Sequence, residues 1–517
     1  MYATIQKSAA EIYIVPGADC PPPGMAIGPG ILFPPEKTKS MNHSSPSAPA
    51  NDRSQPEKLR FSTKLAYGAG DMGAGITTIL ISFTLLIFLT EVAGLDPGLA
   101  GTVLMIGKVW DAINDPIIGM LSDRTRSRWG RRRSWMLFGS LPFGLSFFLY
   151  WLVPHFSADP DLNKWALFAY YVLVSIFFQT AYTAVNLPYT ALTPEITQDY
   201  NERTSLNSFR FAFSIGGSIL ALILGVVLSQ FIPDPKQMYV TLGGICAILS
   251  MLPLYWCVFG TQERYQTPTD PSSLSLISQF KVALSNRPFQ FVIGIYLFSW
   301  LALQLTTAVI PFFVVSWMRR DSFFEVALIV QFVAIIMLFV WSAISKSLGR
   351  KAVYFMGMGF WIIAQAGLFF LPRDRPDVMF FLAVLAGVGV ATAYLVPWSM
   401  LTDVIDLDEL NTGERREGIF YSFMVFLQKL GLGLGIFLVG QTLKWSGFIE
   451  SAGSTTIPEQ PDSALFAIRM AIGPLPTLFL IGGLILAYFY PLSREVHASI
   501  LLQLYERKHK AEVKGLE

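Results

Sequence analysis

The segment GKVWDAINDPIIGML, residues 107–121, places ionisable side chains inside a long apolar run. Asp111, Asn114 and Asp115 are spaced i, i+3 and i+4, so they share one face of a helix. A charged residue at the centre of a bilayer costs about 2.5–3.5 kcal/mol on insertion scales, so two carboxylates there need a cation, a basic partner or water. Hard cations such as Na⁺ prefer oxygen ligands, so the segment predicts a cation site. A proton is the alternative, because two close carboxylates repel each other and favour protonation of one of them.

Basic residues near this acid pair allow a second interpretation, in which the carboxylates only form structural ion pairs. Lys108 lies one turn before Asp111 on the same predicted helix, and Lys429 lies deep in a later apolar run. Asp71, within YGAGDMGAG, is a further acid at membrane depth, and its neighbouring glycines would let helices approach closely. Asp71 could bind a substrate, form an ion pair or take part in gating.

The composition indicates that these residues belong to a membrane protein. Of the 517 residues, 53% are hydrophobic and only 14% are charged, against about 25% in soluble domains. The net charge of +2 gives no reason to expect nucleic acid as a partner. Cys20, Cys246 and Cys257 lack metal-binding spacing and no histidine lies at membrane depth, so we expect free thiols, no cofactor and no histidine metal site.

Twelve apolar runs are each long enough to cross a bilayer as a helix, which takes about 20 residues. We expect an all-α membrane protein with twelve transmembrane helices, because lipid offers no partners for open strand edges. The predicted spans lie near residues 70–93, 97–121, 134–154, 165–192, 207–231, 238–260, 288–316, 322–347, 352–372, 378–402, 417–446 and 464–490.

Basic loops predict how these helices are oriented, since Lys and Arg concentrate in cytoplasmic loops. Loop 122–133, SDRTRSRWGRRR, holds six arginines and one aspartate, and loop 345–351, SKSLGRK, and the tail after Arg494 are also basic. Twelve alternating helices place all three on one side. We therefore predict a multi-pass protein of the cell (inner) membrane with both termini in the cytoplasm.

The two basic loops are six predicted helices apart, which indicates an internal repeat of two six-helix bundles. One hypothesis is that Met41 is the natural start and that residues 1–40 come from an over-extended reading frame. The predicted parts are a disordered tail at 1–59, a first bundle at 60–260, a cytoplasmic linker at 261–287, a second bundle at 288–490 and a cytoplasmic tail at 491–517.

Several motifs resemble known transporter families. A Gly, Asp-Arg, Gly-Arg-Arg pattern resembles the loop signature of the major facilitator superfamily, and its residues are Gly119, Asp123, Arg124, Gly130, Arg131 and Arg132. KLAYGAGDMG, KVWDAINDPIIG, TRSRWGRRR, YTAVNLPYTALTPEIT and DVIDLDEL resemble the glycoside–pentoside–hexuronide:cation symporters, the melibiose permease group, over about residues 61–490. VPWSMLTDVID also resembles the more distant sodium-dependent lysolipid symporters.

The resemblance to the melibiose permease group implies a cation site. It assigns Asp111, Asn114, Asp115 and Thr183 to that site, whose ion would be Na⁺, Li⁺ or H⁺. Any metal there would be an alkali cation held by Asp111 and Asp115. Lys429 matches the family's lysine near the cation and sugar sites, and is also a candidate for substrate binding.

The same resemblance implies a substrate pocket. Tyr182 and Arg210 match pocket residues of the family, whereas Asn186 and Thr190 stand where the family has a sugar-binding aspartate and a tryptophan. The loss of that carboxylate and that ring puts galactosides in doubt, although Asn and Arg can still hydrogen-bond hydroxyl groups.

Two further pocket candidates fit the family less directly. The family's first sugar-binding aspartate aligns with Gly75, and Asp71 lies one turn nearer the cytoplasm on the same face. Trp398 follows a proline, so a broken helix there could place the indole at the pocket, or the ring could simply pack in lipid or core.

Acidic residues crowd the predicted cytoplasmic end of the tenth span. We expect Asp403, Asp406, Asp408 and Glu409 to meet the arginine loops as latches that break when the cavity opens inward. A solvated acidic loop is the alternative.

The leading hypothesis is a secondary active transporter in the lipid bilayer, which couples a cation (Na⁺ or H⁺) to symport of a small solute by alternating access, and we expect this solute to be a sugar or glycoside. A lysolipid or another amphiphile is the alternative cargo, and a non-transporting sensor is a less favoured class. No Walker A motif, HExxH motif or Cys–His pair is present, so we do not expect an enzyme.

Overall fold

A computed structural model describes residues 58–265, 281, 283–320, 322–414, 416–451 and 458–514. All regular structure within these ranges is helical. Nearly all of the tail predicted at 1–59 and most of the linker predicted at 261–287 lie outside the described residues.

The first part of the chain forms a run of helices that ends at Gly260. They are α2 (Phe61–Ala69), α3 (Met72–Leu80), the π-helical turns η1 (Ile81–Leu85) and η2 (Phe88–Val92), α4 (Pro97–Arg124), α5 (Arg131–Leu149), α6 (Pro160–Ala191), α7 (Thr193–Ile196), α8 (Tyr200–Phe231) and α9 (Pro235–Gly260).

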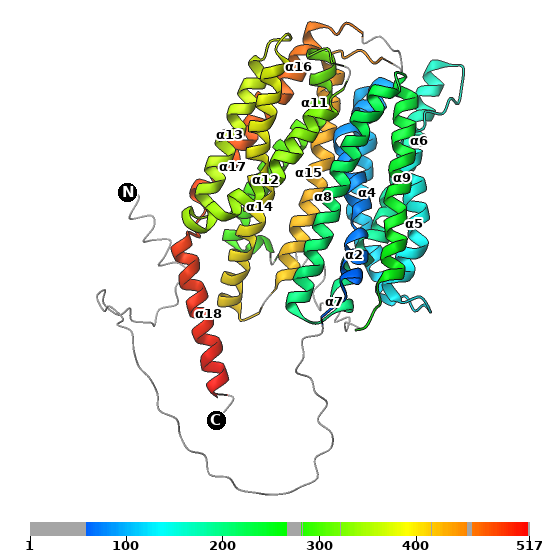
Figure 1. Cartoon of the computed structure of the whole chain (residues 1–517). Coiled ribbons are helices and arrows are strands. Elements are labelled where there is room, and N and C mark those ends of the chain that lie inside the picture. Colours follow the sequence, from blue (N-terminus) through cyan, green and yellow to red (C-terminus); the bar gives the residue numbers. More distant parts are fainter. Residues whose placement is uncertain are drawn as a thin grey trace, which may run out of the picture. The chain divides into compact units, whose positions relative to one another are not determined.

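The second part begins at Arg287 and runs to a C-terminal helix that extends beyond the ends of the others (Figure 1). Its elements are α11 (Arg287–Phe312), η3 (Phe313–Trp317), α12 (Phe324–Leu348), α13 (Arg350–Phe370), α14 (Pro376–Thr412), α15 (Glu417–Trp445), α16 (Asp462–Ile472), α17 (Pro474–Phe489) and α18 (Arg494–Lys514).

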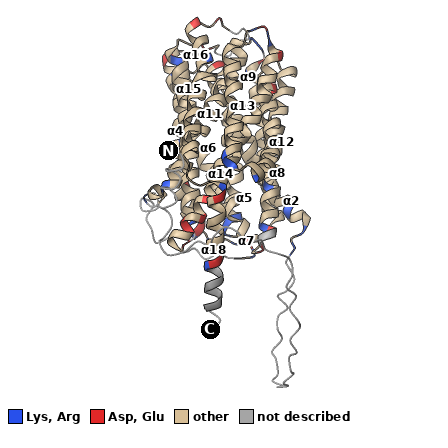
Figure 2. Ribbon diagram, turned by 90° about the vertical axis from the view of Figure 1, so that its left-hand side faces the viewer, with Lys and Arg blue, Asp and Glu red and all other residues tan. Residues whose placement is uncertain are grey.

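Among the described residues, nine helical segments are long and apolar enough to cross a membrane, and all nine fall on predicted spans. The predicted spans 97–121 and 134–154 are also helical, as α4 and α5, but internal charges in α4 and the arginines that open α5 reduce their apolar character. Charged residues gather at the two ends of the helices and are sparse between them (Figure 2). Cys246 and Cys257 are buried free thiols, as predicted.

An aspartate followed by a proline starts several helices. Asp96, Asp159 and Asp234 each precede the first helical residue, which is proline in all three cases. Each carboxylate accepts hydrogen bonds from backbone N–H groups of the first turn that have no partner within the helix. Proline suits the first position because its missing N–H is not needed there.

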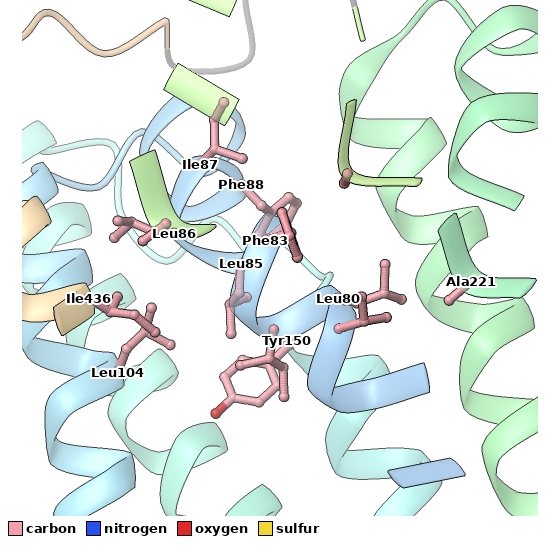
Figure 3. Close-up of a cluster of buried hydrophobic side chains, with 14 of the residues drawn as sticks. Leu80, Phe83, Leu85, Leu86, Ile87, Phe88, Leu104, Tyr150, Ala221 and Ile436 are labelled. Atoms are coloured by element: carbon pink, nitrogen blue, oxygen red, sulfur yellow. The ribbon is translucent and has the colours of Figure 1, made fainter. Parts of the chain in front are cut away.

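The two parts of the chain pack along a few helix pairs. α4 lies along α15, α8 lies along α12, and η1 contacts α11. The largest buried apolar cluster contains residues from both parts, including Leu85, Leu104 and Ile436 (Figure 3). Its members from the second part come from the helix ends remote from loop 345–351, such as Phe313 and Phe448. A second cluster contains only residues after position 282. Within the described residues, the apolar core that the two parts share therefore lies at the end opposite the basic loops.

Candidate functional site

The acid pair of α4 meets a lysine of α15 near the middle of both helices. The Lys429 Nζ lies 3.0 Å from Asp111 Oδ1 and 2.5 Å from Asp115 Oδ2. Thr183 of α6 lies with its Oγ1 3.1 Å from the Oδ1 of each aspartate. The side chain of Asp111 is buried, whereas that of Asp115 is 28% exposed. The carboxylate oxygens of α4 and the hydroxyl oxygen of α6 thus converge on one point, and the ammonium group of α15 contacts the carboxylates.

A second lysine balances the charge of this cluster. Lys108 Nζ lies 3.7 Å from Asp111 Oδ2 and 3.5 Å from Gln179 Oε1. Two ammonium groups therefore accompany two carboxylates. Gln179 was not predicted from the sequence, although its position one turn before Thr183 on the same helix face could have indicated it.

Asn114 is placed differently from the other predicted cation ligands. Its side chain is buried, and its Nδ2 has no hydrogen-bond partner among the described residues. Asp111, Asp115 and Thr183 are brought together, whereas no hydrogen bond joins the Asn114 side chain to them in the described part of the chain. That part also holds no group of three or more His, Cys, Asp or Glu residues that could bind a metal ion. The oxygens that the structure gathers at one point are those of the two carboxylates and of the Thr183 hydroxyl.

A second ion pair, whose carboxylate is buried, lies in the first part of the chain. Arg210 of α8 donates its Nε–H to Asp71 Oδ2 at 3.3 Å. Asp71 stands at the junction between α2 and α3, and its side chain is buried. Gly75, one turn further, packs so closely on α8 that an added Cβ would lie 1.9 Å from the Ser214 carbonyl oxygen. This close packing holds Asp71 within reach of Arg210.

The other predicted substrate residues of the first part share one face of α6. Tyr182, Asn186 and Thr190 are spaced by four residues and are all partly exposed. The Tyr182 ring packs 5.9 Å from the Phe178 ring, and Thr190 donates its hydroxyl to the Leu187 carbonyl at 2.9 Å. The Asn186 side-chain amide gives this face both a donor and an acceptor for hydroxyl groups.

The broken helix predicted at the proline before Trp398 is absent. α14 runs without interruption through Pro397, because membrane helices tolerate a proline when neighbouring groups satisfy the freed carbonyl. Trp398 instead joins an aromatic cluster, where it stacks on Tyr421 at 5.8 Å and meets Tyr296 edge-on at 5.7 Å.

The arginines of the first basic loop pair within their own part of the chain. Arg132 forms an ion pair with Asp123, and Arg131 and Arg132 contact Glu195 at 2.5 and 3.3 Å. Gly130 has a φ of +100°, which favours glycine at this turn. Arg124 ends α4 and is exposed, and Gly119 faces Leu187 of α6.

Two glutamates of this region were not predicted. Glu195 lies in the LTPEIT motif, and its burial opposite two arginines depends on a contact that the sequence does not reveal. Glu263 accepts hydrogen bonds from the backbone N–H groups of Arg131, Arg132 and Arg133 at 2.7–2.8 Å, so it caps the start of α5.

The acidic cluster of α14 contacts the second basic loop and the C-terminal helix. Asp403 forms an ion pair with Arg350, and His497 of α18 lies 3.1 Å from Asp403 and 3.0 Å from Asp406. Arg416 bonds to Asp408 at 2.7 Å, and this hydrogen bonding raises the pKa of the Arg416 guanidinium. No ion pair recorded in the described part of the chain joins this cluster to arginines of loop 122–133.

Long apolar helices with paired charges near their centre, and ion pairs at one end, are typical of membrane transporters. The family model described as MFS/sugar transport protein matches residues 66–494. The chain therefore belongs to this family of the major facilitator type.

Three relatives agree with this assignment. A protein of Synechocystis sp. named as an uncharacterized symporter, sll1374, is 49% identical, with 87% of this chain and 98% of that protein covered. The inner membrane symporter YicJ of Escherichia coli is 28% identical over 88% of this chain and 97% of its own. The sodium-dependent lysophosphatidylcholine symporter 1 of Xenopus tropicalis is 28% identical over 87% and 91%. The protein is thus a multi-pass symporter of the cell membrane and not an enzyme.

Solved structures agree on the fold alone. The inward-open xylose transporter XylE of Escherichia coli superposes with a TM-score of 0.55 at 14% identity, covering 83% of this chain and 95% of its own.

Proposed function

We propose that this protein is a secondary active symporter in which a cation and a small polar solute share one transport cycle, and that the solute is a sugar or glycoside. The observation that carries the proposal is the contact of Lys429 with both aspartates of α4. The acid pair belongs to the first part of the chain and the lysine to the second. A cation that binds the carboxylates competes with an ion pair between the two parts, so ion binding changes how strongly they hold together.

The architecture that serves this cycle is two six-helix bundles, residues 60–260 and 288–490, with twelve membrane-spanning helices and both termini in the cytoplasm. The repeated relation between a basic loop and an acid supports it. Arg131 and Arg132 lie in the first basic loop and meet Glu195, and Arg350 lies in the second and meets Asp403. Internal repeats of this kind are common in transporters.

The described conformation corresponds in this proposal to a carrier open toward the cytoplasm. The apolar core shared by the two parts lies at the end opposite the basic loops, which we assign to the outside. Leu104 and Ile436 lie close together in this seal (Figure 3). In the alternate state the seal opens, and new ion pairs between the two bundles form at the basic end and close it.

The solute site of this proposal lies next to the cation site. Arg210 and Asp71 supply a donor and an acceptor, and Asn186 of α6 lies one turn from Thr183. Hydroxyl groups of a sugar can satisfy both kinds of group. The cation favours solute binding and, by thermodynamic reciprocity, the solute raises the affinity for the cation.

The test is Asp115→Cys in the full-length protein in proteoliposomes, with a panel of radiolabelled sugars and with Na⁺ and H⁺ gradients imposed separately. Cation-stimulated uptake should fall to background, because the variant removes one of two carboxylate ligands. Asp161→Cys, which removes an exposed carboxylate at the start of α6, should transport like the wild type. Undiminished uptake by Asp115→Cys would exclude this carboxylate from ion coupling, and the gradient that drives wild-type uptake identifies the ion.

A lysolipid or similar amphiphile is the second candidate cargo, and one cavity favours it. A cavity of about 460 Å³ lies between α4, α11 and α15, and Lys108 is its only charged lining residue. The remaining lining residues, such as Leu297, Phe298 and Leu434, form an apolar wall that suits an acyl chain. Cation-driven uptake of lysophosphatidylcholine without uptake of any sugar would favour this candidate over the first.

A further inference from the structure

A second large cavity lies away from the transport site, at the basic end of the second part of the chain. It has a volume of about 760 Å³ and lies where the loop between α12 and α13 meets the segment between α17 and α18, with α14 behind. Its charged lining residues are Lys346, Arg350, Lys351, Asp403, Arg494, Glu495 and His497.

The charges of this cavity divide into a balanced group and a cationic group. Arg350 is paired with Asp403, and His497 lies between Asp403 and Asp406. These contacts leave the inner wall close to neutral, so this wall does not select an anion.

Three other cations have no carboxylate partner in the ion pairs of the described residues. Lys351 donates to the Tyr488 carbonyl at 2.5 Å, and Arg494 donates to the Ser347 carbonyl at 2.8 Å. Lys346 is exposed. Carbonyl groups orient the first two side chains without neutralising them, so all three charges remain available to an anion.

One acid lies among these cations. Glu495 accepts a hydrogen bond from Ser493 at 2.7 Å, which lowers the pKa of its carboxyl, so it stays ionised. Three cations and one anion leave a net positive charge at the mouth of the cavity.

Apolar side chains continue outward from the same mouth. Leu348 is 59% exposed and Phe355 is 36% exposed, and both line the cavity. Tyr488 and Phe489 at the end of α17 are exposed beside Lys351, an arrangement of aromatic and basic side chains that is typical of a membrane–water interface. A ligand in this cavity would contact cationic side chains at one end and exposed apolar side chains at the other.

We propose that this cavity binds the headgroup of an anionic phospholipid, with the phosphate at Lys346, Lys351 and Arg494 and the acyl chains along Leu348 and Phe355. The lipid connects the α12–α13 loop to the start of α18, two segments that lie far apart in the sequence. Basic pockets between membrane helices at the cytoplasmic side are suited to such headgroups.

The experiment measures the thermal unfolding of the purified full-length protein in detergent while phosphatidylglycerol, phosphatidylcholine or inorganic phosphate is added, with native mass spectrometry to count retained lipid. The test variant is Lys346→Gln with Arg494→Gln. The control is Lys164→Gln with Lys236→Gln, which removes the same charge near the starts of α6 and α9.

Phosphatidylglycerol should stabilise the wild type and the control far more than phosphatidylcholine does. A basic residue near an anionic lipid contributes roughly fivefold in affinity, so the test variant should bind phosphatidylglycerol about 25-fold more weakly. Lys346→Gln alone, which removes no recorded contact, should weaken binding about fivefold and so guards against misfolding of the double variant.

Three results would overturn the proposal. The control could lose as much affinity as the test variant, phosphatidylcholine could bind as well as phosphatidylglycerol, or inorganic phosphate alone could reproduce the full stabilisation. The last result would assign the cavity to a free anion instead of a lipid.

Discussion

Lys429 contacts both aspartates of α4. Removal of its charge should raise the affinity for the coupling cation, whereas removal of a carboxylate ligand should lower it. Lys429→Gln should bind the coupling cation more tightly than the wild type. The lysine Nζ lies 3.0 Å from Asp111 Oδ1 and 2.5 Å from Asp115 Oδ2, so a cation bound to these oxygens must displace or tolerate an ammonium group. Gln removes the competing charge and keeps a side chain of similar length.

The size of the effect follows from the geometry. Two like charges about 4 Å apart repel by about 4 kcal/mol at an effective dielectric constant of about 20. Because the side chain of Asp115 is 28% exposed, solvent screening and movement of the ammonium group reduce this value to about 1–2 kcal/mol. The cation dissociation constant should therefore fall about tenfold, since 1.4 kcal/mol corresponds to a factor of ten.

The assay is isothermal titration of the purified variant with Na⁺, Li⁺ and protons, followed by solute binding at saturating cation. The matched control is Lys444→Gln, which removes the same charge from the same helix but at its far end, where Lys444 pairs with Asp96 at 3.3 Å. Its cation affinity should equal that of the wild type. An unchanged or weaker cation affinity in Lys429→Gln would refute competition between the lysine and the ion.

Two further predictions concern stability, measured as thermal unfolding in detergent. Gly75→Ala should destabilise the protein by about 1–3 kcal/mol, because the new Cβ would lie 1.9 Å from the Ser214 carbonyl oxygen, whereas Gly216→Ala, which meets nothing within 4 Å, should be neutral or slightly stabilising. Equal effects of the two would contradict the close packing of α3 on α8. Glu263→Gln should cost about 1–2 kcal/mol, because a neutral amide is a weaker acceptor for the three N–H groups that open α5, and the exposed Glu459→Gln should cost nothing measurable.

The sequence predicted helices better than it predicted where they end. The first span was predicted to begin at residue 70, but α2 begins at Phe61, and the span predicted at 378–402 continues as α14 to Thr412. Hydropathy identifies the apolar part of a helix that lies within the hydrocarbon core of the bilayer. The added turns carry charges such as Asp403 and Asp408, which are paired by other segments, and hydropathy is insensitive to that pairing.

The residues of the candidate site were likewise predicted only in part. The spacing of Asp111 and Asp115 placed both on one helix face, and the structure directs both toward Lys429. The roles of Glu195 and Glu263 were not predicted, because each depends on a contact with α5 from a segment more than 60 residues away. Spacing along one helix reports which residues share a face, but it does not report which distant segment covers that face.

The pairing of two lysines with two aspartates has an electrical consequence for a symporter. Without a bound ion, Lys108, Lys429, Asp111 and Asp115 sum to zero charge. The unloaded carrier would then reorient without moving net charge at this point, and its return would be insensitive to membrane voltage. With a monovalent cation bound, the four groups and the ion together have a net charge of +1. Transport of an electrically neutral solute would then carry a current, and the membrane voltage would drive only the reorientation of the loaded carrier.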